Sequence, residues 1–250
     1  MQASPLTNAN SIIEDICSRI VNQPTYISSG DFWLRQKARD IEKLKSVDTV
    51  NYWSLRACLN YFQGNVADME QCLNQAGQVC SDTTVELTRL QLRANLCLAS
   101  RSQELFREFV DIKFQNLKQN ILVSKTIGAF QGAMRKFAQA ELAHVNIDDE
   151  SFVTQMKHAA QLLEKLGVTD PDCAGVIDCA GHILRERKLF WMNSAPDLSV
   201  YEETHGVALR FKLNTSYAQA TEMNGELADL LISKNLDQLP FYVTFEGSFQ

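Results

Sequence analysis

Apolar residues recur at intervals of three and four positions through most of the chain before residue 190, and this spacing predicts a succession of amphipathic helices. The pattern is clearest over residues 31–45, where charged residues surround a single apolar stripe. That stripe consists of Leu34, Ala38, Ile41 and Leu44. Asp31 stands just before the stripe and is predicted to cap the N-terminus of the helix.

Glycine and proline mark the predicted ends of later helices. A long helix is predicted over residues 121–145, with Gly128 inside it at a place where a neighbouring helix would approach closely. Gly167 is predicted to end the next helix in the left-handed conformation. Asp170, followed by Pro171, is predicted to cap the helix after that. About eight helices joined by short polar loops are expected in this part of the chain.

The pattern changes to that of strands after residue 195. Residues 198–203 and 207–213 look extended, residues 216–234 have helical spacing, and the last segment alternates between the two faces of a strand. In that last segment Phe241, Val243 and Phe245 alternate with Tyr242, Thr244 and Glu246. The order predicts a small ββαβ unit, which would be marginally stable alone and is expected to dock on the helices.

The most strongly patterned stretch is NYWSLRACLNYFQGNVADMEQCLNQA, residues 51–76. Two short apolar-striped segments flank Gly64-Asn65, and the spaced positions are occupied by Trp53, Ala57, Leu73 and Ala76. This arrangement resembles the tetratricopeptide repeat, a pair of antiparallel helices. Three features depart from that family: Asn60 replaces its usual Tyr, Met69 replaces a small Ala, and no Pro follows Ala76. A second copy, shifted by 36 residues, is degraded, since Ser100-Arg101 replaces Gly-Asn and no Trp is present.

The resemblance implies a partner-binding groove along the inner face of the first helix of the hairpin. That face carries Asn51, Ser54, Cys58 and Tyr61. In the degraded copy the equivalent positions are wholly apolar, namely Leu87, Leu90, Ala94 and Cys97. A groove open to water does not normally expose such a stripe. Three interpretations stay open: the register slips, a segment of the chain fills the groove, or an apolar partner helix occupies it.

Patterning and resemblance together predict a mainly α protein in two parts. Residues 1–195 are expected to form an antiparallel helical-repeat body of the α-solenoid kind. Residues 196–250 are expected to form the small C-terminal ββαβ unit docked on that body.

Charge and composition exclude some classes of function. The formal net charge is −6, and the residues from Pro196 onward carry eight acidic and three basic side chains, so most of the negative charge is at that end. Nucleic-acid binding is therefore not expected. No secretory signal and no apolar run long enough to span a bilayer is apparent. Seven scattered cysteines fit reduced thiols, so a cytoplasmic protein is expected.

Candidate chemistry is sparse, because the chain lacks the phosphate-binding loop, the nucleophile elbow and the zinc-protease motif. The best catalytic-looking group is Asp178, Cys179 and His182, which helical spacing would place on one side of a helix. Buried cysteines and an Asp–His helix pair explain it more simply. Glu141, His144 and Asp148 form a second group, typical of surface electrostatics at a helix end. No cofactor, metal ligand or catalytic residue is therefore predicted.

These observations favour a non-enzymatic protein or peptide binder: an adaptor, a chaperone-like protein or a subunit of an assembly. The alternative is a metal- or thiol-dependent hydrolase that uses Asp178, Cys179 and His182. Besides the four residues of the groove, Tyr242 on the last strand is predicted to bind a partner. Its exposed ring is expected to meet the helical body, a second copy of the chain in a homodimer, or a different protein.

Overall fold

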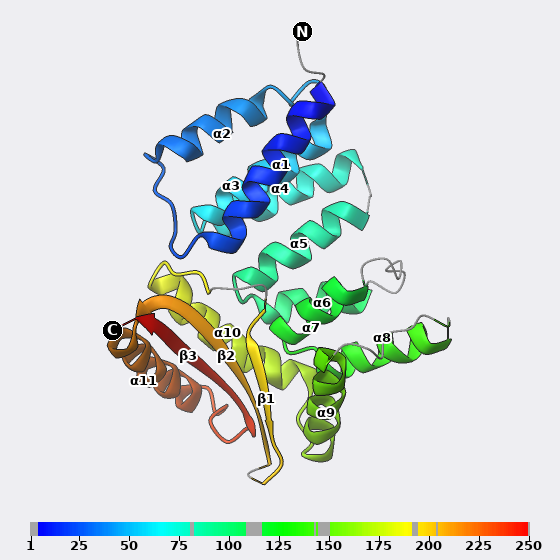
Figure 1. The fold of residues 1–250 in the computed structure, drawn as a ribbon, viewed down its shortest axis with the longest axis vertical. Coiled ribbons are helices and arrows are strands. Elements are labelled where there is room, and N and C mark those ends of the chain that lie inside the picture. The colour runs from blue at the N-terminus through cyan, green and yellow to red at the C-terminus, as the bar shows by residue number, and fades with distance from the viewer. Residues whose placement is uncertain are drawn as a thin grey trace. The chain divides into compact units, whose positions relative to one another are not determined.

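In the computed structural model the described residues are 5–80, 83–108, 117–142, 144, 151–191, 195–203 and 205–249. They form eleven helices and a small three-stranded sheet (Figure 1), which confirms the expectation of a mainly helical chain with a small C-terminal sheet. The chain divides into two compact units. Unit 1 comprises residues 1–92 and 188–190, and unit 2 comprises residues 93–187 and 191–250.

Unit 1 contains α1 (Pro5–Asn22), α2 (Phe32–Glu42), α3 (Thr49–Phe62), α4 (Val66–Val79) and most of α5 (Thr83–Asn95). The apolar stripe of α2 faces the core, where Leu34 and Ile41 are buried. The side chain of Asp31 accepts a hydrogen bond from the backbone N–H of Leu34 at 3.1 Å. The predicted N-cap is therefore confirmed.

Helices α3 and α4 form a tightly packed pair over the stretch that resembles a tetratricopeptide unit. Gly64 adopts φ +73° and ends α3, because its N–H donates to the carbonyl of Tyr61 while the next N–H donates to the carbonyl of Asn60. Between the helices Ala57 and Leu73 are fully buried. The assignment of this pair to the repeat family and its stacking with other helices into a solenoid stay predictions.

Unit 2 begins with the end of α5 and continues through α6 (Ala99–Glu108), α7 (Leu117–Thr126), α8 (Phe130–Leu142), α9 (Ser151–Lys165) and α10 (Asp170–Glu186). The single helix predicted over residues 121–145 is wrong, because Gly128 divides it. This glycine adopts φ +69° and ends α7 with the same pair of hydrogen bonds that ends α3. A Cβ at Gly128 would lie 2.8 Å from Cys173, so the residue also permits close packing against α10.

The predicted cap of α10 is also corrected. Thr169, not Asp170, occupies the N-cap and forms a reciprocal capping box with Asp172. The carboxylate of Asp170 instead accepts hydrogen bonds at 2.8 Å from the backbone N–H groups of Gln131 and Gly132, at the start of α8. One helix therefore supplies the N-terminal cap of another.

The C-terminal segment has the predicted ββαβ order: β1 (Asp197–Tyr201), β2 (Gly206–Ser216), α11 (Tyr217–Ser233) and β3 (Phe241–Phe249). Strands β1 and β2 are antiparallel, whereas β2 and β3 are parallel and α11 connects them. One face of the sheet packs against helices: α9 contacts β1 and β2, while α10 and α11 contact β3. The predicted boundary between residues 195 and 196 thus lies inside unit 2.

Candidate functional site

The other face of the sheet is not covered by the helices of unit 2. Along β2 and over residues 241–248 of β3 the odd-numbered residues are buried, whereas the even-numbered ones other than Gly206 are exposed or half-buried, as expected for a sheet with one solvated face. We define the outer face by six side chains that point away from the helices: Asp197, Tyr201, Arg210, Lys212, Tyr242 and Glu246. Tyr242 was predicted from the sequence, whereas Tyr201 was missed.

Two tyrosines border a patch of small residues at one end of the outer face. Tyr201 is 45% exposed and lies opposite Gly206 in the strand register, and Tyr242 is 46% exposed and lies opposite Ala208. The ring of Tyr242 covers Gly206, because a Cβ there would lie only 2.6 Å from Cε2 of the tyrosine. Because Gly206 has no side chain, one face of the Tyr242 ring lies close to the sheet, and the other face of the ring stays exposed.

Beyond the tyrosines the outer face carries two ion pairs between neighbouring strands. The Nζ of Lys212 lies 2.8 Å from Oδ2 of Asp197, and this bond raises the pKa of the lysine. Arg210 lies 3.6 Å from Glu246. Both pairs are half-exposed, so their contribution to stability is small. The charges balance each other, which leaves the tyrosines as the distinctive feature of this face.

Side-chain amides protect both edges of the sheet. On β3, Asn224 of α11 donates to the carbonyl of Phe245 at 2.9 Å and accepts from the N–H of the same residue at 2.8 Å. On β1, Gln155 of α9 donates to the carbonyl of Leu198 at 2.6 Å. These amides occupy backbone positions that another strand would need for pairing. The outer face is therefore a better candidate for contact with a partner than either edge.

The stripe predicted to line the repeat groove is largely enclosed. Cys58 and Tyr61 are buried, with 7% and 2% of their surfaces exposed, and the ring of Tyr61 stacks on Phe190 at 4.7 Å between centroids. Burial raises the pKa of the Cys58 thiol to about 12. Asn51 is half-buried and donates to the carboxylate of Asp48 at 2.7 Å, and Ser54 is half-buried. Partner binding by these four residues stays a prediction.

The apolar stripe of the degraded copy is also enclosed. Leu90, Ala94 and Cys97 are buried and Leu87 is half-buried. Cys97 lies beyond the end of α5 and adopts φ +49°, so helical spacing does not extend to it. Burial raises the pKa of its thiol to about 12. Which of the three interpretations holds for this stripe stays a prediction.

Asp178, the first of the candidate catalytic residues, holds the turn between α5 and α6. Its carboxylate accepts a 2.6 Å hydrogen bond from the N–H of Ala99 and further bonds from the N–H and hydroxyl of Ser100. On the same face of α10, Arg185 donates to the carbonyl of Leu96 at 2.7 Å. The carboxylate caps α6, and the guanidinium binds a carbonyl at the end of α5.

Cys179 and His182 do not join Asp178 in a site. Cys179 is buried, and burial raises the pKa of its thiol, which disfavours the nucleophilic thiolate. His182 is exposed. Across the described ranges, no group of three or more histidine, cysteine, aspartate or glutamate side chains is arranged to hold a metal ion.

We expect Asp178→Ala to destabilise the protein by about 1–2 kcal/mol, the typical effect of losing a helix cap. His182→Ala should change the free energy of unfolding by less than about 0.5 kcal/mol, because the side chain is exposed. Urea unfolding followed by circular dichroism measures both. Equal stability of the two variants would contradict the capping role of Asp178.

The second group does not converge on one site either. Glu141 is exposed and binds Lys157 of α9 at 3.0 Å, while His144 is exposed at φ +56°. Asp148 lies outside the described residues. The Glu141–Lys157 contact is a surface ion pair between α8 and α9.

Within the described part of the chain, no helix combines the length and apolar character needed to cross a membrane. Comparison of the chain with protein-family models, curated proteins and solved structures found no match. Function must therefore be inferred from the residues of the chain itself.

Proposed function

We propose that the protein is a non-enzymatic protein-binding protein and that the outer face of its C-terminal sheet contacts the partner. The observation that carries this proposal is the pair of half-exposed tyrosines, Tyr201 and Tyr242, on either side of Gly206. Candidate catalytic side chains elsewhere have structural partners or are buried, as Asp178 and Cys179 illustrate.

Tyrosine suits such a contact because its rigid ring buries a large area at a low entropic cost and its hydroxyl still finds a hydrogen-bond partner. Beside the rings, Ala208 has a small, half-buried side chain, so a flat segment of a partner can pack against the sheet there. The ion pairs of Arg210 and Lys212 form a polar rim, an arrangement typical of protein interfaces.

The kind of partner is part of the proposal. A protein or peptide fits the neutral, tyrosine-bearing outer face better than nucleic acid, which the overall charge of −6 disfavours. A second copy of the chain would make the interaction a homodimer, and a foreign protein would make the chain an adaptor or an assembly subunit. We also propose that the protein acts in the cytoplasm and that its repeat-like helical surface takes part in binding.

We expect the double variant Tyr201→Ser/Tyr242→Ser to remain folded but to bind its partner at least about tenfold more weakly, since tyrosine is enriched among the interface residues whose truncation costs more than about 1 kcal/mol. Tyr217→Ser is the matched control, because this tyrosine is 52% exposed at the start of α11 and follows the end of β2 that is far from Gly206.

The partner is first captured by in-cell cross-linking of the wild-type protein, and the variants are then compared by calorimetry with that purified partner. Analytical ultracentrifugation tests the homodimer in the same three proteins. Equal weakening by the Tyr217 control, or unchanged binding and mass in the double variant, would show that the outer face is not the interface.

A further inference from the structure

Helix α2 in unit 1 presents an exposed face that combines an aromatic ring with two cations. Phe32 is 75% exposed, and Arg35 and Arg39 are exposed as well. Their spacing of three and four residues places all three on one side of the helix. The opposite side, with Leu34 and Ile41, is buried in the core of unit 1. The exposed face is therefore held in place by a well-packed helix.

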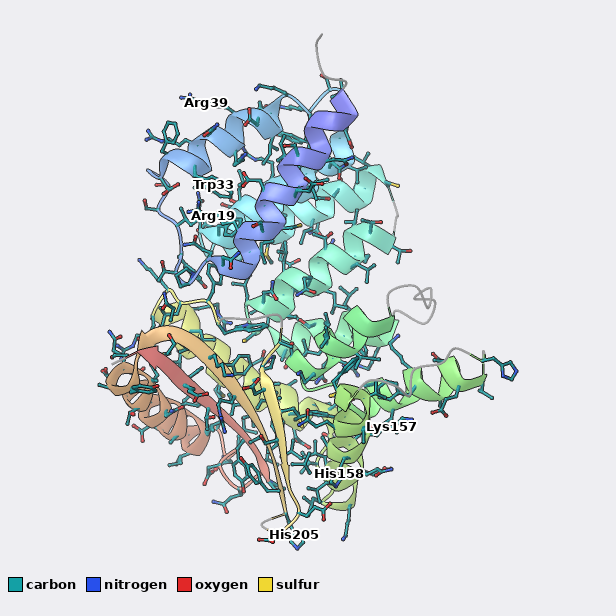
Figure 2. All side chains as sticks on the ribbon, viewed as in Figure 1. Arg19, Trp33, Arg39, Lys157, His158 and His205 are labelled. Atoms are coloured by element: carbon teal, nitrogen blue, oxygen red, sulfur yellow. The ribbon has the colours of Figure 1, made fainter. Side chains whose placement is uncertain are left out.

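The other cations nearby already have partners. Lys37 lies 2.6 Å from Asp15, Lys43 lies 2.7 Å from Asp40, and Lys45 lies 3.6 Å from Glu42. Arg19 lies over the ring of Trp33 at 4.3 Å. By contrast, the guanidinium groups of Arg35 and Arg39 form no ion pair among the described residues. Figure 2 shows Arg39 pointing away from α1, whereas Arg19 and Trp33 lie toward each other.

We propose that this face of α2, defined by Phe32, Arg35 and Arg39, binds an acidic segment of another protein. Guanidinium groups bind carboxylates through two parallel hydrogen bonds, and they shed water more readily than ammonium groups. The exposed ring of Phe32 supplies an apolar contact beside them. The expected ligand is a peptide with one apolar residue followed by two carboxylates.

The spacing of the two arginines indicates how those carboxylates are arranged. Four residues of α-helix separate Arg35 from Arg39 by about 6 Å along the axis. Alternate side chains of an extended peptide are about 6.5–7 Å apart, so carboxylates separated by one residue match the arginines.

Other anionic partners fit this face less well. Asp40 and Glu42 on the same helix reduce the attraction for a polyanion such as nucleic acid. A single exposed phenylalanine is a small apolar contribution for insertion into a membrane, where a whole apolar helix face is normally buried. The inference does not depend on the outer face of the sheet, because it concerns different residues in the other unit.

The test uses the full chain and a short fluorescein-labelled peptide that carries one leucine and two glutamates spaced by one residue. Fluorescence anisotropy should detect binding that weakens as salt is added, because exposed charge pairs are screened. The double variant Arg35→Glu/Arg39→Glu should bind at least about tenfold more weakly, because two attractive pairs become repulsive. Phe32→Ser should weaken binding about threefold, the effect of losing one small apolar contact.

The matched control is Arg135→Glu/Lys165→Glu, which changes the net charge equally at exposed residues of α8 and α9. Binding by this control should stay within about twofold of the wild type, since long-range charge effects are screened at physiological salt. Equal weakening in the control would overturn the proposal. A peptide Kd above about 1 mM would also overturn it, as would selective binding of anionic phospholipid vesicles or single-stranded DNA in place of the peptide.

Discussion

Deleting residues 240–250 is expected to unfold unit 2 and not to release a folded monomer. The deletion removes three buried side chains, Phe241, Val243 and Phe245, from the face of the sheet that packs against helices. Loss of one buried phenylalanine side chain typically costs about 3–5 kcal/mol, and the total stability of a domain is about 5–15 kcal/mol. Removing two buried phenylalanines together with a whole strand is therefore expected to cost more free energy than the total stability of unit 2.

Hydrogen exchange read by mass spectrometry measures this outcome, because the amides of α9, α10 and α11 should lose protection in the truncated chain. A matched variant keeps the strand but changes its exposed side: Tyr242→Ser/Thr244→Ala should retain full protection, since neither side chain is buried. Native protection in the truncated chain, together with a change from dimer to monomer, would instead identify the strand as an interface between copies.

Structural features set by adjacent residues were predicted correctly. Asp31 caps α2, because its carboxylate and the N–H that it accepts from are three residues apart. Gly167 ends α9 at φ +72°, and the N–H of Val168 donates to the carbonyl of Leu163 as the predicted left-handed ending requires. The alternation in β3 also lies within a few residues. Each of these signals is contained in one short segment, so no knowledge of the tertiary structure is needed.

Features set by distant residues were not predicted. The apolar spacing over residues 121–145 continues across Gly128, but this glycine ends α7 at φ +69° and packs closely against Cys173 of α10. Asp170 resembles an N-cap from its position before a proline, but Thr169 takes that role and the carboxylate binds the start of α8. Gly128 and Asp170 contact residues that are remote in the sequence, and the local pattern does not indicate these contacts.

Among the candidate binding residues, too, exposure was predictable where it depends on local alternation and not where it depends on a distant contact. Tyr61 lies on the stripe that the repeat resemblance implies, but its ring stacks on Phe190, a contact that no local spacing indicates. Tyr242 was predicted because the alternation of its strand places it opposite the buried residues. The same alternation in β1 places Tyr201 on the face of the sheet opposite to buried Leu198, so the exposure of Tyr201 could also have been predicted from the sequence.

Two glycines in long helices of unit 2 give the sharpest test of the packing around α10, because the same substitution should have opposite effects at them. In α10, a Cβ at Gly181 would lie 2.4 Å from the carbonyl oxygen of Cys97 and 2.7 Å from its Cβ. The turn that Asp178 and Arg185 hold would have to move away. In α11, a Cβ at Gly225 would meet no atom within 4 Å.

Gly181→Ala is therefore expected to destabilise the protein by about 1–2 kcal/mol, since overpacking against rigid backbone outweighs the better helix propensity of alanine. Gly225→Ala should stabilise it by about 0.5–1 kcal/mol through that propensity alone. Urea denaturation of the two variants and the wild type gives both values, with the sign as the decisive result. If Gly181→Ala proved as stable as the wild type, α10 and the turn between α5 and α6 would not be in contact as described.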